Sequence, residues 1–197
     1  MSHYFETPVG DPRIRQVPAT IWGRDYVFAT SSGVFSGTRL DLGTSVLLRE
    51  VAPPEAGRLL DLGCGFGPIA VALADHSPGV TVDAIDVNDR ALELTRRNAS
   101  EHGVAARVRV CRPEEVAEET VYDEIWSNPP IRIGKDALHG LLLDWLPRLI
   151  PGGAAYLVVG KNLGADSLQR WLDAQGYPCQ RLASAKGFRV LRAAARS

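Results

Sequence analysis

Apolar positions recur along the chain with two different periods, one typical of strands and one typical of helices. From residue 58 onward, segments with the two periods alternate regularly. Apolar runs or every-other-residue patterns predict strands at 58–62, 80–86, 107–111, 121–127 and 153–160. Spacing of three and four residues predicts helices at 68–75, between Asn88 and Gly103, at 136–149 and at 165–175. Strands that alternate with helices predict a doubly wound, Rossmann-like α/β fold with a mostly parallel sheet and helices on both faces.

The C-terminal part departs from this alternation. Two short strands near 178–182 and 188–191 are separated by little more than the turn Lys186-Gly187, so they predict one antiparallel hairpin.

The N-terminal part is also different. The patterns at 19–23 and 25–30 predict a small hairpin, and a helix is expected to begin near Thr44. A helix cannot cross Pro53-Pro54. We therefore expect an N-terminal extension, residues 1–52, that forms a lid packed on the same domain, and a ligand-binding domain over residues 53–197.

The composition is that of an ordinary globular protein. Of 197 residues, 45% are hydrophobic and 23% charged, which excludes wholesale disorder and fibrous architectures. No apolar run approaches the roughly 18 residues that a membrane helix needs, and the first residues lack the apolar stretch of a signal peptide. We therefore expect no membrane contact. The three cysteines are odd in number and lie far apart, so we expect reduced thiols, no metal site and a cytoplasmic location.

A glycine-rich turn joins the first strand of the regular part to its helix. Asp61 stands near the end of the strand, and Gly63, Gly65 and Gly67 follow at alternate positions. Glycines allow a backbone to approach a ligand closely, and the helix N-terminus offers free N–H groups. The next strand ends at Asp86, whose carboxylate can accept hydrogen bonds from ribose hydroxyls. The pattern predicts a nucleoside-containing ligand, with a ligand-free turn as the alternative.

The spacing of this turn indicates which ligand. It is GxGxG preceded by Asp61, whereas a dinucleotide site has GxGxxG and directs helix N–H groups to a pyrophosphate. A carboxylate at the mouth of the turn would repel a pyrophosphate. It suits a cationic group instead, such as the amino group in the methionine part of S-adenosylmethionine (AdoMet), which is therefore the predicted cofactor. Cys64, inside the turn, is expected to be a small packing residue.

The segment Asn128-Pro129-Pro130-Ile131 carries the candidate catalytic chemistry. Two prolines fix the backbone and remove two donors, so the carbonyl groups stay free. An asparagine side-chain oxygen and a proline carbonyl can then accept both hydrogens of one amino group. Such binding turns the nitrogen lone pair toward an electrophile, through orientation and dipole placement and without a metal. A plain strand-ending turn is the alternative.

Together, these motifs resemble class I AdoMet-dependent methyltransferases of the amino-group type. Within them the chain is similar to the small-domain family related to the small-subunit ribosomal RNA guanine-N2 methyltransferases. Further matching stretches are 33–36 with 40–44, Gly134-Lys135 and 161–165. The resemblance covers nearly the whole chain. It implies a seven-stranded sheet with an antiparallel last strand, AdoMet as methyl donor, and guanine N2 of ribosomal RNA as the acceptor.

The resemblance also implies roles for individual residues. The methionine part of AdoMet would be held by Asp61, Gly63, Cys64, Gly65 and Gly67, and the ribose by Asp86 with Val87. The donor pocket would be lined from the side by Asp41 and Thr44, and Asn128 would contact the cofactor too. The catalytic segment would be Asn128, Pro129, Pro130 and Ile131, and the substrate contacts would include Phe35, Arg132 and Lys135.

One departure from the family concerns the partner that stacks on the target base. Many amino methyltransferases have an aromatic residue after Asn-Pro-Pro, which stacks on a flipped base, whereas this chain has Ile131. Ile131 offers only apolar contact, so stacking falls to another residue. Phe35 and Phe28 are the candidates, with packing in the core as the alternative for both.

The net charge of −1 hides an uneven distribution of charge. The 22 basic and 23 acidic residues nearly cancel, but residues 177–197 contain no acid and residues 113–124 contain no base. Arg132 and Lys135 lie just past Asn-Pro-Pro. Such side chains contact phosphates, so RNA stays the expected partner, with ordinary surface charge as the alternative.

Three other functions compete with RNA methylation. A protein glutamine amide offers the same two N–H groups, so a glutamine amide N5-methyltransferase is an alternative in the same reaction class. A nicotinamide dinucleotide oxidoreductase is disfavoured by the GxGxG spacing and by the lack of a convincing Tyr-Lys or His catalytic pair. A non-catalytic RNA-binding module is disfavoured by the intact Asn-Pro-Pro.

Overall fold

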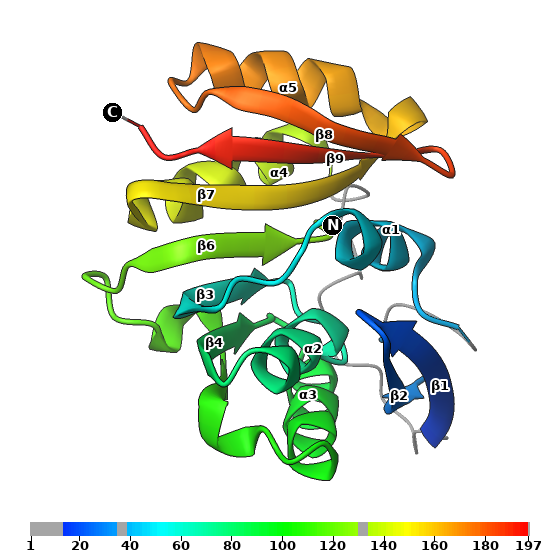
Figure 1. Cartoon of the computed structure of the whole chain (residues 1–197). Helices are drawn as coiled ribbons and strands as arrows, with labels where there is room; N and C mark the ends of the chain where they lie inside the picture. The colour runs from blue at the N-terminus through cyan, green and yellow to red at the C-terminus, as the bar shows by residue number, and fades with distance from the viewer. Residues whose placement is uncertain (1–13, 35–38, 130–133, 197) are drawn as a thin grey trace.

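The computed structural model of the protein describes residues 14–34, 39–129 and 134–196 (Figure 1). Its helices are α1 (Leu42–Glu50), α2 (Pro68–His76), α3 (Asp89–Glu101), α4 (Lys135–Trp145) and α5 (Ala165–Ala174). Its strands are β1 (Ile14–Ile21), β2 (Arg24–Ser31), β3 (Ala56–Leu62), β4 (Gly79–Ile85), β5 (Val108–Cys111), β6 (Tyr122–Ser127), β7 (Leu149–Gly160), β8 (Cys179–Ala185) and β9 (Phe188–Ala194). None of the helices in these ranges has the length and apolar character needed to cross a lipid bilayer.

Seven strands form one sheet with the order β5-β4-β3-β6-β7-β9-β8. β3 pairs in parallel with β4 and β6, and parallel pairing continues to β5 on one side and to β7 on the other. The last strand, β9, lies between β7 and β8 and is antiparallel to both (Figure 1). The predicted doubly wound sheet with an antiparallel last strand is therefore confirmed.

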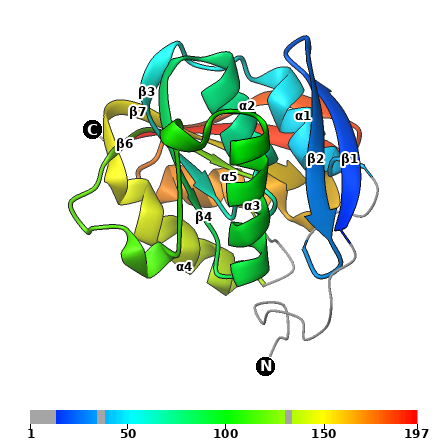
Figure 2. The same ribbon diagram turned by 90° about the horizontal axis from the view of Figure 1, so that it is seen from below.

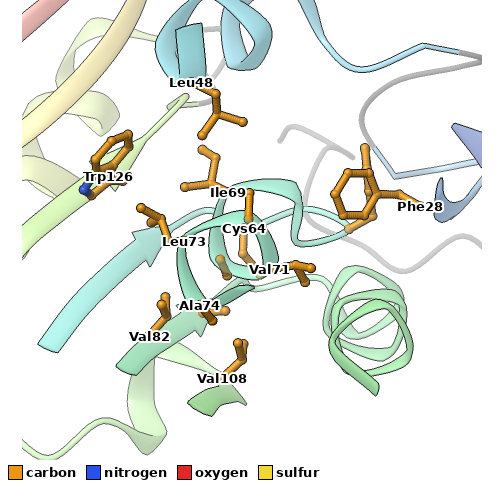
Figure 3. Close-up of a cluster of buried hydrophobic side chains, with 14 of the residues drawn as sticks. Phe28, Leu48, Cys64, Ile69, Val71, Leu73, Ala74, Val82, Val108 and Trp126 are labelled. Carbon is orange, nitrogen blue, oxygen red and sulfur yellow. The ribbon is translucent and has the colours of Figure 1, made fainter. Parts of the chain in front are cut away.

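Two hydrophobic clusters cover the two faces of this sheet. One contains side chains of α1, α2 and α3 together with Phe28 of β2, and Figure 3 shows Phe28 and Ile69 within it. The other contains side chains of α4 and α5, such as Leu142 and Leu168. Figure 2 shows α2 and α4 on opposite sides of the sheet. Helices on both faces are what a sheet of apolar parallel strands requires.

Particular residues fix the starts of three helices. The side chain of Asn88 accepts hydrogen bonds from two backbone N–H groups in the first turn of α3, as an N-cap residue does. Pro68 occupies the first position of α2, where its missing N–H is not needed. Asp41 caps α1 by accepting a 3.0 Å hydrogen bond from the N–H of Thr44. The sequence pattern predicts the first two starts but not the role of Asp41 as a cap.

One predicted helix is too long. The prediction of a helix over 136–149 is wrong at its C-terminal end, because α4 ends at Trp145 and Leu149 already begins β7. Pro147 lies between them and lacks the N–H that an α-helix would need there. A short 3₁₀ turn over Leu146–Arg148 therefore leads into the strand.

The N-terminal hairpin packs against helices and does not join the large sheet. β1 and β2 pair only with each other, and Figure 1 shows them near α3. The turn residues Trp22 and Gly23 have φ of 47° and 78°, which matches the twist of paired strands. Asn98 of α3 accepts a 2.7 Å hydrogen bond from the N–H of Ala29, and donates to the carbonyls of Ala29 and Phe66 at 2.9 and 2.7 Å. This one side chain ties the hairpin to both α3 and the glycine turn.

Replacing Asn98 with alanine should destabilise the protein. The substitution leaves three backbone groups without partners, and each unsatisfied buried group costs about 1–3 kcal/mol. We expect the free energy of unfolding to fall by about 3 kcal/mol in urea titrations followed by tryptophan fluorescence. Arg97→Ala, at an exposed position of the same helix, is the control and should change it by less than about 0.5 kcal/mol. An unchanged free energy in Asn98→Ala would contradict this role.

Candidate active site

The carboxyl ends of β3 and β6 form the centre of the candidate site. The two strands are neighbours although β4 and β5 come between them in the chain, so the strand order reverses here. Ligands of open α/β sheets bind in the crevice beyond such a reversal. Asp61 and Trp126 are in register, and the hydroxyl of Ser127 donates a 2.7 Å hydrogen bond to the carbonyl of Leu62. The glycine turn and Asn128 therefore leave the sheet side by side.

The glycine turn folds back against the end of β4. The N–H groups of Gly63 and Cys64 donate to the carbonyl of Ile85 at 3.0 and 2.9 Å. Gly63 and Gly65 have φ of 77° and 59°, a conformation that favours glycine. A Cβ on either glycine would have no described heavy atom within 4 Å beyond its chain neighbours. The space beside both glycines is therefore open to a ligand.

Thr95 of α3 supports the turn from the other side. Its hydroxyl donates a 2.9 Å hydrogen bond to the carbonyl of Gly65 and lies 3.5 Å from the Sγ of Cys64. A Cβ on Gly67 would lie 2.7 Å from the Cγ2 of Thr95, so a larger residue would push α3 away. Burial raises the pKa of the Cys64 thiol well above its usual range, which makes it a neutral packing group. Nothing in the sequence pattern singles out Thr95.

Asp61 is fully buried near the end of β3. Its Oδ2 accepts a 3.0 Å hydrogen bond from the N–H of Ala70 in α2, whereas no described residue donates to its Oδ1. Burial raises the pKa of this carboxyl to about 7; the Ala70 hydrogen bond lowers it and the charge of Asp86 raises it. An ammonium group beside Oδ1 would satisfy the free oxygen and offset the cost of the buried charge.

Asp86 follows β4 and lies against the same turn. Its Oδ2 accepts a 3.0 Å hydrogen bond from the N–H of Gly65, and its Oδ1 accepts one of 2.9 Å from the N–H of Asn88. Burial raises the pKa of the carboxyl, and these backbone donors lower it. Asp86 is half-buried and Val87 is exposed, so both can contact a ligand held over the glycine turn.

Asn128 follows β6 and is held by two residues at the start of α1. Its Nδ2 donates a 2.7 Å hydrogen bond to the Oδ2 of Asp41 and a 3.1 Å one to the Oγ1 of Thr44. No described residue donates to its Oδ1. Pro129 is buried next to it. The acceptor oxygen of the amide is therefore available to a substrate.

The remaining predicted site residues lie outside the described ranges, on the surface or in the core. Phe35, Pro130, Ile131 and Arg132 lie outside the described residues. Lys135 is exposed at the first position of α4. Phe28 is fully buried, with its ring stacked on Tyr26 and 5.9 Å from the ring of Phe66. Phe28 therefore packs in the core, and the prediction that it is a candidate for stacking on a base is wrong.

The structure brings another aromatic residue to Asn128. Phe188 begins β9 and pairs with Gly160 at the end of β7. A Cβ on Gly43 would lie 3.1 Å from the Cε1 of Phe188 and 3.2 Å from the Oδ1 of Asn128. The ring edge and the amide oxygen thus share the small space beside Gly43. The pattern of β9 reads as a strand, and no local signal points to Phe188 or to Gly43 as neighbours of Asn128.

The residues present fit the predicted cofactor. The free Oδ1 of Asp61 suits an ammonium group, and the open space at Gly63 and Gly65 admits a ligand close to the backbone. Asp86 touches the same turn and can accept from ribose hydroxyls. A methyl donor held there would lie at the same edge of the sheet as Asn128.

Comparison with known proteins gives the same picture. The chain matches the family described as "Methyltransferase small domain" over residues 25–192. It is 33% identical over 195 residues to the uncharacterized protein YbxB of Bacillus subtilis (strain 168). That match covers 97% of this chain and 96% of YbxB. It is 35% identical over 146 residues to the Ribosomal RNA small subunit methyltransferase C of Citrobacter koseri, which covers 72% of this chain and 41% of that protein.

Two solved structures illustrate the likeness of fold. A T. thermophilus 16S rRNA N2 methyltransferase in complex with AdoMet and guanosine has a TM-score of 0.82 and 24% identity, covering 96% of this chain and 52% of that chain. A methyltransferase from Pyrococcus furiosus has a TM-score of 0.65 and 20% identity, and the match covers 79% of this chain and 83% of that chain. The chain spans about half the length of the ribosomal RNA methyltransferases that it matches.

The raised pKa of Asp61 predicts a pH dependence. The Asp61 carboxyl binds its proton more tightly in the folded state than in the unfolded state. Its contribution to the free energy of unfolding of the ligand-free protein is therefore fully present below about pH 4. That contribution is lost as the pH rises toward 7. An ammonium group beside Oδ1 favours the carboxylate, so the affinity for AdoMet should rise by up to about tenfold per pH unit and level off above about pH 7.

Calorimetric titration of AdoMet between about pH 5.5 and about pH 8 checks this expectation. The near-isosteric variant Asp61→Asn should bind AdoMet more weakly and with little dependence on pH. Parallel pH profiles in the two proteins would contradict the proposed contact between Asp61 and the ammonium group.

Proposed function

Because the chain belongs to the Methyltransferase small domain family, we propose that it transfers the methyl group of AdoMet to an exocyclic amino group, the N2 of a guanine in ribosomal RNA. The reaction class and the cofactor follow from the family, as the sequence motifs predict. The acceptor is the part that requires experiment.

The observation that carries the proposal is the free side-chain oxygen of Asn128 at the carboxyl end of β6. It can accept one hydrogen of an amino group, and the carbonyl of Pro129 can accept the other. Bound AdoMet supplies an electrophilic methyl group. Asn128 and Pro129 turn the nitrogen lone pair toward that group and stabilise the positive charge that develops on the nitrogen.

The glycine turn after β3 is proposed to hold the cofactor. Asp61 binds its ammonium group, the backbone at Gly63 and Gly65 lies against its methionine part, and Asp86 accepts from its ribose hydroxyls. Asp61 precedes the turn between β3 and α2, and Asp86, after β4, accepts a hydrogen bond from Gly65 within it, so the cofactor is held by connected parts of the sheet edge. This connection favours a fixed distance between donor and acceptor, which is the main source of rate in such a reaction.

Exposed lysines support a polyanionic acceptor. Lys135 opens α4, Lys161 follows β7, and Lys186 occupies the turn between β8 and β9, so all three lie at the carboxyl edge of the sheet. The N–H of Lys161 donates a 2.7 Å hydrogen bond to the carbonyl of Gly187, which brings these two turns together. Lysines at the edge of the sheet that carries the proposed active site can contact the phosphates of an RNA strand.

Other observations agree with an RNA substrate in the cytoplasm. The relatives from Citrobacter koseri and T. thermophilus are named as ribosomal RNA methyltransferases. The three cysteines are free and buried, in keeping with a reducing compartment. Arg24 and Arg189 form ion pairs within the protein, with Asp75 and Asp166, so neither is assigned to RNA.

The N-terminal extension is proposed to act as a lid. After β2 the carbonyl of Gly33 accepts a 3.3 Å hydrogen bond from the Nδ2 of Asn88, next to Asp86. Before α1, Asp41 binds Asn128. The extension therefore contacts the site both on the cofactor side and on the acceptor side.

Replacing Asn128 with alanine tests the mechanism. Loss of one preorganised hydrogen-bonding group should reduce kcat about 10²–10³-fold, with little change in the dissociation constant of AdoMet. Transfer from labelled AdoMet to small-subunit ribosomal RNA measures the rate, and calorimetry measures binding. Gln180→Ala, exposed on the edge strand β8, is the control. Full activity in Asn128→Ala would show that the assigned mechanism is wrong.

The same assay identifies the acceptor. Separated RNA and protein fractions are incubated with the wild-type enzyme, and we expect label in RNA, located at guanine N2 by mass spectrometry of nucleosides. Label in protein alone would replace the RNA proposal with methylation of a glutamine amide. AdoMet binding without label in either fraction would point to a module without catalytic activity.

The lysines give a separate prediction about RNA binding. The double variant Lys161→Ala/Lys186→Ala should raise the KM for RNA about tenfold at moderate salt and lower the salt slope by about two, because two phosphate contacts are lost. The kcat at saturating RNA should stay unchanged. Arg49→Ala, exposed at the far end of α1, serves as control. An unchanged KM in the double variant would contradict this contact surface.

A further inference from the structure

One carboxylate oxygen connects α1 to the catalytic segment. The Oδ2 of Asp41 accepts a 3.0 Å hydrogen bond from the N–H of Thr44, which caps the helix, and a 2.7 Å hydrogen bond from the Nδ2 of Asn128. The same Nδ2 donates a 3.1 Å hydrogen bond to the hydroxyl of Thr44. Both hydrogens of the Asn128 amide are thus used by two residues that lie 87 and 84 positions away in the chain.

The chemistry of these partners decides which end of the amide faces the substrate. An amide has a donor end and an acceptor end of similar size, and a half-turn exchanges them. A carboxylate oxygen accepts and does not donate. After a half-turn the amide oxygen of Asn128 would face the Oδ2 of Asp41 with no hydrogen between them. Only the observed orientation gives Asp41 a hydrogen bond from Asn128.

This orientation sets what the site offers to an amino group. With both amide hydrogens engaged, the Oδ1 of Asn128 is the end of the amide that accepts from no described residue, and a Cβ on Gly43 would lie 3.2 Å from it. If the amide turned round, an NH₂ group would face the NH₂ group of the acceptor, and neither could accept. The catalytic oxygen of Asn128 therefore depends on a partner that rejects the other orientation.

We propose that Asp41, assisted by Thr44, is the positioning residue of the reaction, because it holds the Asn128 oxygen toward the acceptor amino group. The inference rests on the proposed function and deepens it. It differs from the role that the family resemblance implies for Asp41 and Thr44, which is to line the donor pocket. A positioning role acts on kcat, whereas a donor-pocket role acts on the binding of AdoMet.

Two substitutions at Asp41 separate the cap of α1 from the contact with Asn128. Serine is as good an N-cap as aspartate, but its shorter side chain does not reach Asn128. Asparagine also caps a helix, and its oxygen can take the place of Oδ2 toward both donors. Asp41→Ser therefore removes only the anchor of Asn128, and Asp41→Asn is the matched control that retains it.

We expect Asp41→Ser to lower kcat about 10- to 100-fold, the range that a misplaced catalytic group produces. Its melting temperature and its dissociation constant for AdoMet should stay close to those of the wild type. Asp41→Asn should retain kcat to within about fivefold, because a neutral oxygen accepts a hydrogen bond somewhat less strongly than a charged one. Thr44→Val, which removes the second acceptor, should show a smaller loss of kcat.

Three results would overturn the inference. Wild-type kcat in Asp41→Ser would show that Asn128 needs no anchor. Weaker AdoMet binding with unchanged kcat would assign Asp41 to the donor pocket. An equal loss of kcat in Asp41→Ser and Asp41→Asn would mean that the charge of Asp41 matters and the hydrogen-bonding geometry does not.

A spectroscopic measurement tests the contact whatever the acceptor is. The side-chain NH₂ signals of Asn128 in a ¹⁵N spectrum, assigned by their loss in Asn128→Ala, should exchange slowly with water in the wild type and in Asp41→Asn. In Asp41→Ser they should exchange at least about tenfold faster, because the hydrogen bond is gone. Equal exchange in all three proteins, with methyl transfer by the wild type intact, would overturn this inference alone. Slow exchange without any methyl transfer would overturn the proposed function and leave the contact in place.

Discussion

The parallel pairing of β3 with β6 is the constraint on which the whole site depends. It sets Asp61 in register with Trp126, so the turn that follows one strand and Asn128 that follows the other begin at the same edge. If the pairing of β3 slipped by one residue, every side chain of the strand would turn to the opposite face. Asp61 would then lose the hydrogen bond that it accepts from the N–H of Ala70. The hydrogen bond from Ser127 to Leu62 closes the pair at that edge. The proposed donor site and the proposed acceptor site are therefore placed by one set of backbone hydrogen bonds.

Local spacing predicts nearly every strand and helix of this protein, because each element buries a face whose period is present in its own residues. It also predicts that Asp61, Asp86 and Asn128 share one edge, since parallel strands bring their ends together. Local spacing does not predict where α4 ends, because Leu149 fits a helical period as well as the start of a strand. Local spacing does not predict the contact between Asp41 and Asn128 either. That contact depends on where α1 packs across β7 and β9, and no local period encodes such packing.

Two oxygen atoms show how this fold trades stability for function. The Oδ1 of Asp61 is buried without a partner, at a cost of about 1–3 kcal/mol, and the Oδ1 of Asn128 accepts from no described residue. Asn98, which holds the hairpin to α3 and the glycine turn, instead makes three hydrogen bonds. Both atoms lie where a cofactor or an amino group is proposed to bind. This is the usual compromise between a stable fold and an active one.

The position of β9 has a consequence for the order in which the chain acquires its shape. β9 is the last strand along the chain, yet it separates β7 from β8 inside the sheet. Until residues 188–194 emerge during synthesis, β7 has an open edge and β8 has no partner strand. N-terminal parts of a chain can fold as they are made, so β3, β4 and the glycine turn can assemble while that edge is still open. Phe188 arrives beside Gly43 only with β9, so a nascent chain would form the proposed binding turn for the methyl donor before Phe188 reaches the neighbourhood of Asn128.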